Sequence, residues 1–277
     1  MRKILVFFMI VVTVLGNLTG IKTVDAENIC FIGHRGASFL CQENTAESFR
    51  KAGEQGFGGV ETDVRITKDG VFVLSHGGSI EMADGTEMDI ADHTYEELTA
   101  QHIKNKKSTT ELDICTFKEY LEICKEFGMI CFIELKGVWP AEKITEAFTL
   151  AGEVYDLSMC ELQSFEFENL VAAHEEFPEL KIMLTCDTHD ALVDKALEYG
   201  FDIDMEYSGL TKETVQMFHD KGLKVACWTA NLNSVVLYCA SLGVDFIESD
   251  IYSEALILRL SDGFTSWLDQ GPAVDEG

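Results

Sequence analysis

The chain has 277 residues, of which 47% are hydrophobic, and it carries a formal net charge of −27 at pH 7. This length and apolar content favour one large domain over two ordinary ones. An acidic surface repels polyanions, which excludes nucleic acid and anionic bilayers as natural partners, although a small ligand can still bind where a site is locally positive.

The first 26 residues have the pattern of a secretory signal peptide. Arg2 and Lys3 precede an apolar stretch over residues 4–15, and small residues follow at the positions that a signal peptidase reads. The stretch is shorter than the roughly 20 residues that a membrane-spanning helix needs. We expect residues 1–26 to direct export to the cell envelope or exterior and residues 27–277 to form one domain; an uncleaved anchor is the alternative.

The sequence contains nine cysteines, all after residue 26, and an odd number cannot pair completely. The sequence contains no C-x-x-C spacing, so the cysteines do not indicate a zinc site. Several lie inside apolar runs, where cysteine usually acts as a small buried hydrophobe. The sequence is compatible both with buried free thiols and with a few disulfides.

Two short segments near the start predict a site. Residues 29–33 are an apolar run typical of a buried strand, and the run ends at His34 and Arg35. A second strand is predicted over residues 59–64, where Glu61 and Asp63 stand two residues apart and therefore share one face. If the two strands are neighbours, their ends build one site for an anion and a cation.

The next elements in the chain are a helix and a hairpin. Residues 44–55 read as a helix that begins with a capping pattern. Residues 67–70 predict a turn after the second strand, and residues 71–76 return alongside it, which brings His76 close to the two carboxylates. Residues 77–112 are polar and weakly periodic, so we expect a flap or short insertion there.

From residue 113 onward, amphipathic helix-length stretches alternate with apolar strands. The expected strands cover residues 129–136, 157–164, 180–186, 201–205, 223–229 and 244–249. Together with the first two they make eight, and eight βα units in about 250 residues predict an α/β fold of the (β/α)8 TIM-barrel type. A doubly wound open sheet is the alternative.

A barrel places active-site residues at the carboxyl ends of its strands. The residues found at these ends are His34 and Arg35, Glu61 and Asp63, Glu134 and Lys136, and Trp228 with Asn231. Chemically active side chains thus cluster where the barrel predicts them.

The polar motifs of the predicted strand ends and loops are, in chain order, His34-Arg35-Gly36, Glu43-Asn44-Thr45, Glu61-Thr62-Asp63, His76, Glu134-Leu135-Lys136, Cys227-Trp228-Thr229-Ala230-Asn231 and the closing segment 243–250. In this order they resemble the glycerophosphodiester phosphodiesterase family. Each motif alone is weak evidence for the family, but their shared order and spacing over residues 30 to 250 are strong evidence.

The resemblance implies a divalent-metal phosphodiesterase that converts a glycerophosphodiester into glycerol 3-phosphate and an alcohol. Glu61, Asp63 and Glu134 would be the metal ligands, since such hard oxygens suit Ca²⁺ or Mg²⁺. Arg35 and Lys136 would bind the phosphate.

His34 and His76 would be the acid and the base, because imidazole can both take and give a proton near neutral pH. In similar enzymes the glycerol 2-hydroxyl is thought to attack first, giving a cyclic phosphate that water then opens. Glu43 and Asn44 would support the site. Trp228 either caps the barrel core or forms one wall of the substrate site, where it could accept a choline-like cation.

The sequence departs from the family pattern in two places. The family usually has Asp after the second histidine, whereas Gly77 follows His76, and residues 79–84 replace an arginine-bearing segment. These departures leave the identity of the leaving alcohol open. The acidic surface favours a zwitterionic substrate over a multiply anionic one. Two alternative functions are also compatible with the sequence: a cyclising lyase like phospholipase C or D, and a non-catalytic glycerophosphodiester-binding protein.

Overall fold

The computed structural model describes residues 29–251. The expected signal peptide and residues 252–277 lie outside the described residues. Within the described range, no helix has both the length and the apolar character needed to span a bilayer.

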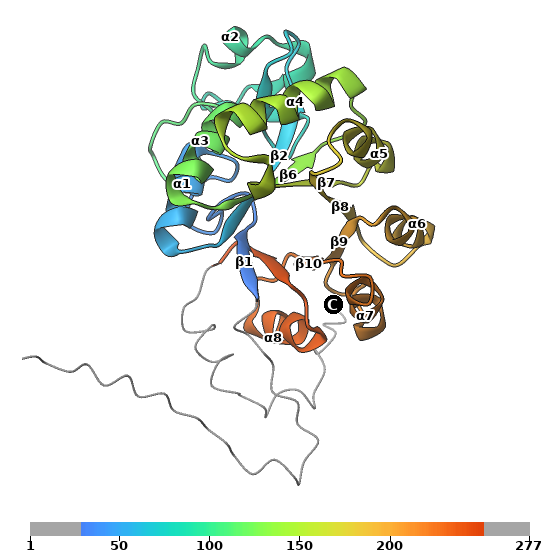
Figure 1. The fold of residues 1–277 in the computed structure, drawn as a ribbon. Coiled ribbons are helices and arrows are strands. Elements are labelled where there is room, and N and C mark those ends of the chain that lie inside the picture. The colour runs from blue at the N-terminus through green and yellow to red at the C-terminus, as the bar shows by residue number, and fades with distance from the viewer. Residues whose placement is uncertain (1–28, 252–277) are drawn as a thin grey trace, which may run out of the picture.

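Eight parallel strands close into a barrel with helices around it (Figure 1). In barrel order the strands are β1 (Cys30–Gly33), β2 (Gly59–Ile66), β6 (Ile130–Leu135), β7 (Cys160–Ser164), β8 (Lys181–Cys186), β9 (Asp202–Glu206), β10 (Val225–Trp228) and β11 (Phe246–Ser249). The first strand pairs in parallel with both β2 and β11, which closes the sheet. This confirms the barrel prediction and excludes the open sheet.

A helix follows most of the strands and packs on the outside of the barrel (Figure 1). The helices are α1 (Ala46–Gln55), α3 (Phe117–Phe127), α4 (Ala141–Val154), α5 (Phe167–Glu176), α6 (Ala191–Tyr199), α7 (Lys212–His219) and α8 (Asn233–Leu242). The first helix starts where Thr45 accepts a hydrogen bond from the Ser48 backbone N–H, and it ends at Gly56, whose φ is 89°. Such side-chain caps and left-handed glycines explain why the predicted helix bounds are close to the observed ones.

Several predicted strands were longer than the observed ones, most clearly at the start of β7. Residues 157–164 were expected to be extended, but Leu157–Met159 form a short 3₁₀ helix and β7 begins at Cys160. The Asp156 side chain accepts a hydrogen bond from the Ser158 backbone N–H, which stabilises the turn at this point.

The expected insertion is a small layer on one side of the barrel. It begins after β3 (Phe72–Leu74), which runs antiparallel to β2, and contains β4 (Ser79–Glu81), β5 (Glu87–Asp89), a 3₁₀ helix (Ile90–Asp92) and α2 (Tyr95–Leu98). Its own buried cluster consists of Val73, Met82, Ile90, Leu98, Ile103 and Ile114. The segment is therefore a packed unit rather than a polar flap.

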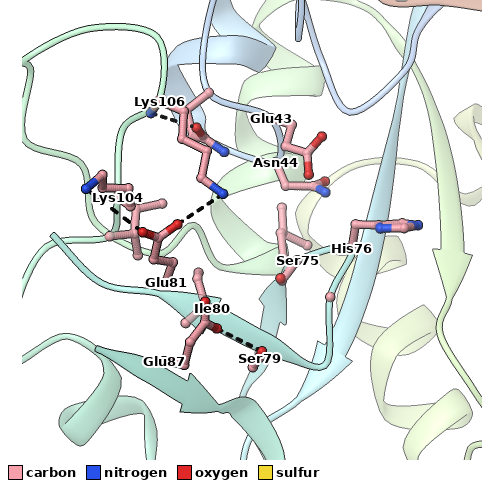
Figure 2. A pocket seen from close by; sticks show the side chains of 14 residues that line it. Glu43, Asn44, Ser75, His76, Ser79, Ile80, Glu81, Glu87, Lys104 and Lys106 are labelled. Atoms are coloured by element: carbon pink, nitrogen blue, oxygen red, sulfur yellow. Dashed lines mark hydrogen bonds and ion pairs between the residues drawn. The ribbon is translucent and has the colours of Figure 1, made fainter. Parts of the chain in front are cut away.

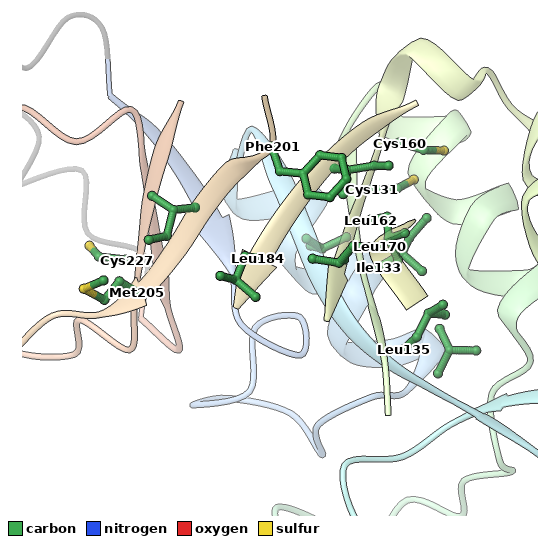
Figure 3. Close-up of a cluster of buried hydrophobic side chains, with 14 of the residues drawn as sticks. Cys131, Ile133, Leu135, Cys160, Leu162, Leu170, Leu184, Phe201, Met205 and Cys227 are labelled. Atoms are coloured by element: carbon green, nitrogen blue, oxygen red, sulfur yellow. The ribbon is translucent and has the colours of Figure 1, made fainter. Parts of the chain in front are cut away.

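Alternation along the strands separates two cores. Outward side chains such as Ile133, Leu162 and Leu184 pack beneath the helices (Figure 3). Inside the barrel, a smaller apolar cluster of Ile32, Phe132, Met183 and Ala226 fills the lower part. The inward positions nearer the carboxyl ends are polar, which leaves that end for a site. All nine cysteines lie in the described part of the chain and are free thiols.

Candidate active site

Three buried carboxylates meet inside the barrel near its carboxyl end. Glu61 and Asp63 come from β2, and Glu134 comes from the neighbouring strand β6, where it pairs in register with Asp63. One oxygen from each of the three lies within 4.8 Å of the others. Glu61 is only 2% exposed, yet its Oε1 has no hydrogen-bond partner among residues 29–251. A set of hard oxygens with one buried oxygen unsatisfied fits a divalent cation.

Two basic side chains lie against this carboxylate group. The Lys136 Nζ is 2.9 Å from Asp63 Oδ1 and 2.7 Å from Glu134 Oε1. The Arg35 Nε is 3.3 Å from Asp63 Oδ2, and its guanidinium also donates to Glu43 at 3.0 Å. Both cations are placed to receive an anion at the barrel mouth.

The charges are distributed unevenly among the carboxylates. Burial raises the pKa of Glu61 well above its usual range, and the negative charges of Asp63 and Glu248 raise it further. Burial would also raise the pKa of Asp63, but Lys136 and Arg35 outweigh it and hold that pKa below its usual value. At Glu61 the positive charge of Arg35 opposes these effects but does not outweigh them.

The loop between β1 and α1 fixes the carboxylates by unusual backbone geometry. Arg35 has a φ of +56° and donates its backbone N–H to Glu61 Oε2 at 2.8 Å. Asn44 has a φ of +55°, donates to Asp63 Oδ2 at 2.7 Å and accepts from Thr62 Oγ1 at 2.8 Å. The supporting role proposed for Asn44 thus has a physical basis in these bonds.

His34 is held by a carboxylate that the sequence analysis did not select. Its Nδ1 lies 2.7 Å from Asp250 Oδ1, which also accepts from Ser38, while Asn231 donates to Asp250 Oδ2 at 2.6 Å. Burial alone would raise the pKa of Asp250, but these hydrogen bonds and the charge of His34 lower it to about 2. An ionised carboxylate only accepts, so the Nδ1 of His34 carries the proton and its Nε2 faces other groups.

His76 follows β3 and is exposed at the edge of the site. Burial of part of the ring and the positive charge of Arg35 lower its pKa, with Lys136 adding to the effect and Asp63 opposing it. His76 also lines a cavity of about 280 Å³ between the barrel and the insertion, together with Glu43 (Figure 2). The hairpin therefore brings His76 to the mouth, as the sequence predicted.

An aromatic pair forms another side of the mouth. Trp228 is half-buried and packs edge to face against Phe165, with ring centroids 5.9 Å apart. The Lys136 Nζ lies 6.0 Å from the Phe165 ring. Trp228 thus partly covers the barrel interior and partly borders the site. The sequence analysis missed the exposed Phe165, because this residue belongs to none of the motifs.

Further polar side chains lie deeper in the barrel and were also missed. Gln163 donates to Glu248 Oε1 at 2.8 Å and to Asp204 Oδ2 at 3.0 Å. Glu248 and Asp204 are almost fully buried. Strand alternation could have revealed them, since each stands at an inward position of a predicted strand.

Comparison with known proteins agrees with this geometry. The model of the glycerophosphoryl diester phosphodiesterase family matches residues 34–252. A glycerophosphodiester phosphodiesterase of Bacillus altitudinis is 27% identical over 241 residues, which cover 82% of this chain and 96% of the relative. The solved structure of a glycerophosphodiester phosphodiesterase from Thermotoga maritima is 25% identical with a TM-score of 0.64 and covers 84% of this chain and 97% of that one. A phosphodiesterase of Oleispira antarctica, solved with the product sn-glycerol-3-phosphate, shares the fold at 23% identity with a TM-score of 0.74, over 87% of this chain and all of that one.

The barrel and the groups gathered at its mouth define a phosphodiesterase. More particularly, the chain belongs to the glycerophosphoryl diester phosphodiesterase family.

Proposed function

We propose that the protein hydrolyses glycerophosphodiesters to glycerol 3-phosphate and an alcohol, with a divalent cation and two histidines. The observation that carries the proposal is the convergence of Glu61, Asp63 and Glu134 with Arg35 and Lys136 at one end of the barrel. Membership of the family supports the substrate class.

Glu61, Asp63 and Glu134 would hold the cation, either Ca²⁺ or Mg²⁺, because all three offer carboxylate oxygens. When bound, the cation supplies a positive charge that polarises the phosphoryl oxygens. Arg35 and Lys136 orient the phosphate beside it, since a guanidinium offers a fork to two oxygens and an ammonium a point charge.

We assign the first proton transfer to His76. Its lowered pKa keeps the ring neutral near pH 7, so it can take the proton of the glycerol 2-hydroxyl. The freed oxygen attacks phosphorus, and the bond from phosphorus to the alcohol oxygen breaks. His34 enters this step with both ring nitrogens protonated and donates the Nε2 proton to that alcohol oxygen, while Asp250 keeps the Nδ1 proton in place.

In the second step the two histidines exchange roles. Nε2 of His34 takes a proton from water, and the water oxygen bonds to phosphorus. The bond to the 2-oxygen breaks, and His76 returns its proton to that oxygen. Both rings regain their starting protonation, so the cycle is balanced.

A lyase that stops at the cyclic phosphate needs only the first step. Asp250 favours complete hydrolysis, because a fixed Nδ1 proton leaves Nε2 of His34 free to accept from water after the first step. A non-catalytic binding protein would not need two histidines at the mouth.

Residues 1–26, which lie outside the described part of the chain, we propose to direct export. Their charged start and short apolar stretch support that proposal.

The direct test is incubation with glycerophosphocholine and Ca²⁺ or Mg²⁺, with and without a chelator. We expect equal amounts of glycerol 3-phosphate and choline in the presence of metal and none with the chelator. Accumulation of a cyclic phosphate alone would favour the lyase, and absence of product under every metal would favour the binding protein. A substrate that lacks the 2-hydroxyl should not react if that hydroxyl is the nucleophile.

A further inference from the structure

A second group of metal-ligating side chains lies beside the three carboxylates. His34, Glu61 and Glu248 each present one ligand atom, and these atoms lie within 4.8 Å of one another. Glu61 belongs to both groups. Glu61 and Glu248 are each 2% exposed, and the His34 side chain is 15% exposed.

The two positive side chains nearby, Arg35 and Lys136, form their ion pairs with carboxylates outside this second group. Lys136 and Arg35 both form ion pairs with Asp63; Arg35 also donates its backbone N–H to Glu61, and its charge lowers the pKa of Glu61 without outweighing burial. Glu248 accepts a hydrogen bond from the side-chain amide of Gln163, which is neutral. The same amide nitrogen also donates to Asp204. Since Glu61 Oε1 has no hydrogen-bond partner among residues 29–251, one buried oxygen of the group is unsatisfied.

The orientation of His34 suits a metal ligand. Asp250 accepts the Nδ1 proton at 2.7 Å, which leaves a lone pair on Nε2. Metal-binding histidines usually donate their other ring N–H to a carboxylate or carbonyl in this way, because that contact fixes the tautomer and strengthens the ligand.

We propose that His34, Glu61 and Glu248 form a second cation site, that it selects a transition metal of the Zn²⁺ type, and that its occupation inhibits the enzyme. One imidazole and two carboxylates suit Zn²⁺ better than Ca²⁺ or Mg²⁺, which prefer sets of oxygens alone. The first group, with three carboxylates, has the opposite preference.

Inhibition follows from the position of His34. A cation bound at Nε2 occupies the lone pair through which His34 exchanges its proton with the alcohol and with water. This part of the inference rests on the proposed function, whereas the binding of zinc does not.

The experiment measures bound metal and activity separately. Wild type, Glu248→Gln and Glu161→Gln are equilibrated with saturating Ca²⁺ and increasing Zn²⁺, and both metals are counted per chain after removal of the free ions. Glu161→Gln is the matched control because Glu161 is an equally buried glutamate that stands at the opposite end of the barrel, at the start of β7. Hydrolysis of glycerophosphocholine is then measured over the same zinc series, and each rate is divided by the zinc-free rate of the same variant.

We expect wild type and Glu161→Gln to bind about one Zn²⁺ per chain and to keep their Ca²⁺. Three protein ligands are the number that open zinc sites use. Glu248→Gln should need a zinc concentration at least about tenfold higher for binding and for inhibition, which is the usual loss when one contact of a metal site is removed. His34→Ala should lose the same zinc, and it serves as the second variant if Glu248→Gln does not fold.

Displacement of Ca²⁺ by Zn²⁺ one for one would place both metals in the first group and overturn the proposal. Equal zinc affinity in wild type and Glu248→Gln would also overturn it, because the metal would then sit elsewhere, for example on a thiol. If zinc binds as expected but wild type hydrolyses no diester under any metal, the second site stands and the proposed function fails.

Discussion

The Nδ1 of His34 lies 2.7 Å from Oδ1 of Asp250, although the two residues are 216 positions apart in the chain. His34 follows the first strand of the barrel and Asp250 follows the last, and these two strands pair in parallel through Cys30–Gly33 and Phe246–Ser249. Closure of the barrel therefore creates this contact. An open sheet would leave the histidine without its partner.

Replacement of Asp250 by asparagine should lower kcat about 10²- to 10⁴-fold, because the amide can also stabilise the wrong tautomer of His34. KM should change little, since Asp250 acts through His34 and not on the substrate. Steady-state kinetics give both values. Ser38→Ala is the control: it removes one hydrogen bond to Asp250 and leaves the contact with His34, so its effect should be smaller. An equal loss in both variants would contradict the role of the carboxylate.

The pH profile of kcat/KM should show an acid limb at lower pH than the 6.5 of an ordinary histidine. Partial burial and the charge of Arg35 lower the pKa of His76, so the neutral, proton-accepting form persists to lower pH. Removal of a positive neighbour in Arg35→Gln should move this limb to higher pH, and removal of a negative neighbour in Glu43→Gln should move it to lower pH. A limb that moves in neither variant would show that another group is the base.

Removal of the metal should destabilise the fold as well as stop the reaction. Glu61, Asp63 and Glu134 repel one another when no cation is bound, and a ligand at about 100 times its dissociation constant stabilises the native state by about 2.7 kcal/mol. Thermal unfolding in Ca²⁺ and in a chelator measures this difference. It should shrink strongly in Glu134→Gln; an unchanged difference would place the cation elsewhere.

Asn44 should matter for stability because it satisfies buried groups in a left-handed backbone conformation. Asn44→Ala loses the hydrogen bonds to Asp63 and Thr62, and alanine also disfavours a φ of +55°. Both Asn44→Gly and Asn44→Ala lose these hydrogen bonds, but only glycine adopts the left-handed backbone without strain. We therefore expect Asn44→Gly to be more stable than Asn44→Ala by about 1 kcal/mol. Denaturant unfolding of both variants tests this. If the alanine variant is the more stable, the backbone at this position is not strained.

The sequence predicted the barrel because its strands and helices differ clearly in period. It also predicted that Glu61 and Asp63 share one face of a strand, since alternation determines which side chains enter the barrel. They were expected to close that strand, but β2 continues to Ile66, so both lie within it. The shortened start of β7 was missed, because Leu157 and Met159 fit the apolar pattern of the strand that follows them.

Contacts between distant segments were harder to predict. Asp250 was visible in the closing motif, but its hydrogen bond depends on the register between the first and last strands. Glu248 stands at an inward position of the last predicted strand, so alternation places it inside the barrel, but its hydrogen bond from Gln163 of a distant strand appears only in the fold. The core of the insertion was missed because Met82, Ile90 and Leu98 occur singly among polar residues, and only the folded chain brings them together.

The central claim is that two histidines at one barrel mouth transfer the protons of diester hydrolysis. Its most direct test is the rate of glycerol 3-phosphate release from glycerophosphocholine in saturating Ca²⁺ by wild type, His34→Ala and His76→Ala, each confirmed to be folded by circular dichroism. We predict turnover by wild type and a loss of at least about 10²-fold in each variant, the usual effect of removing a general acid or base. Turnover by either variant at the wild-type rate would contradict the account.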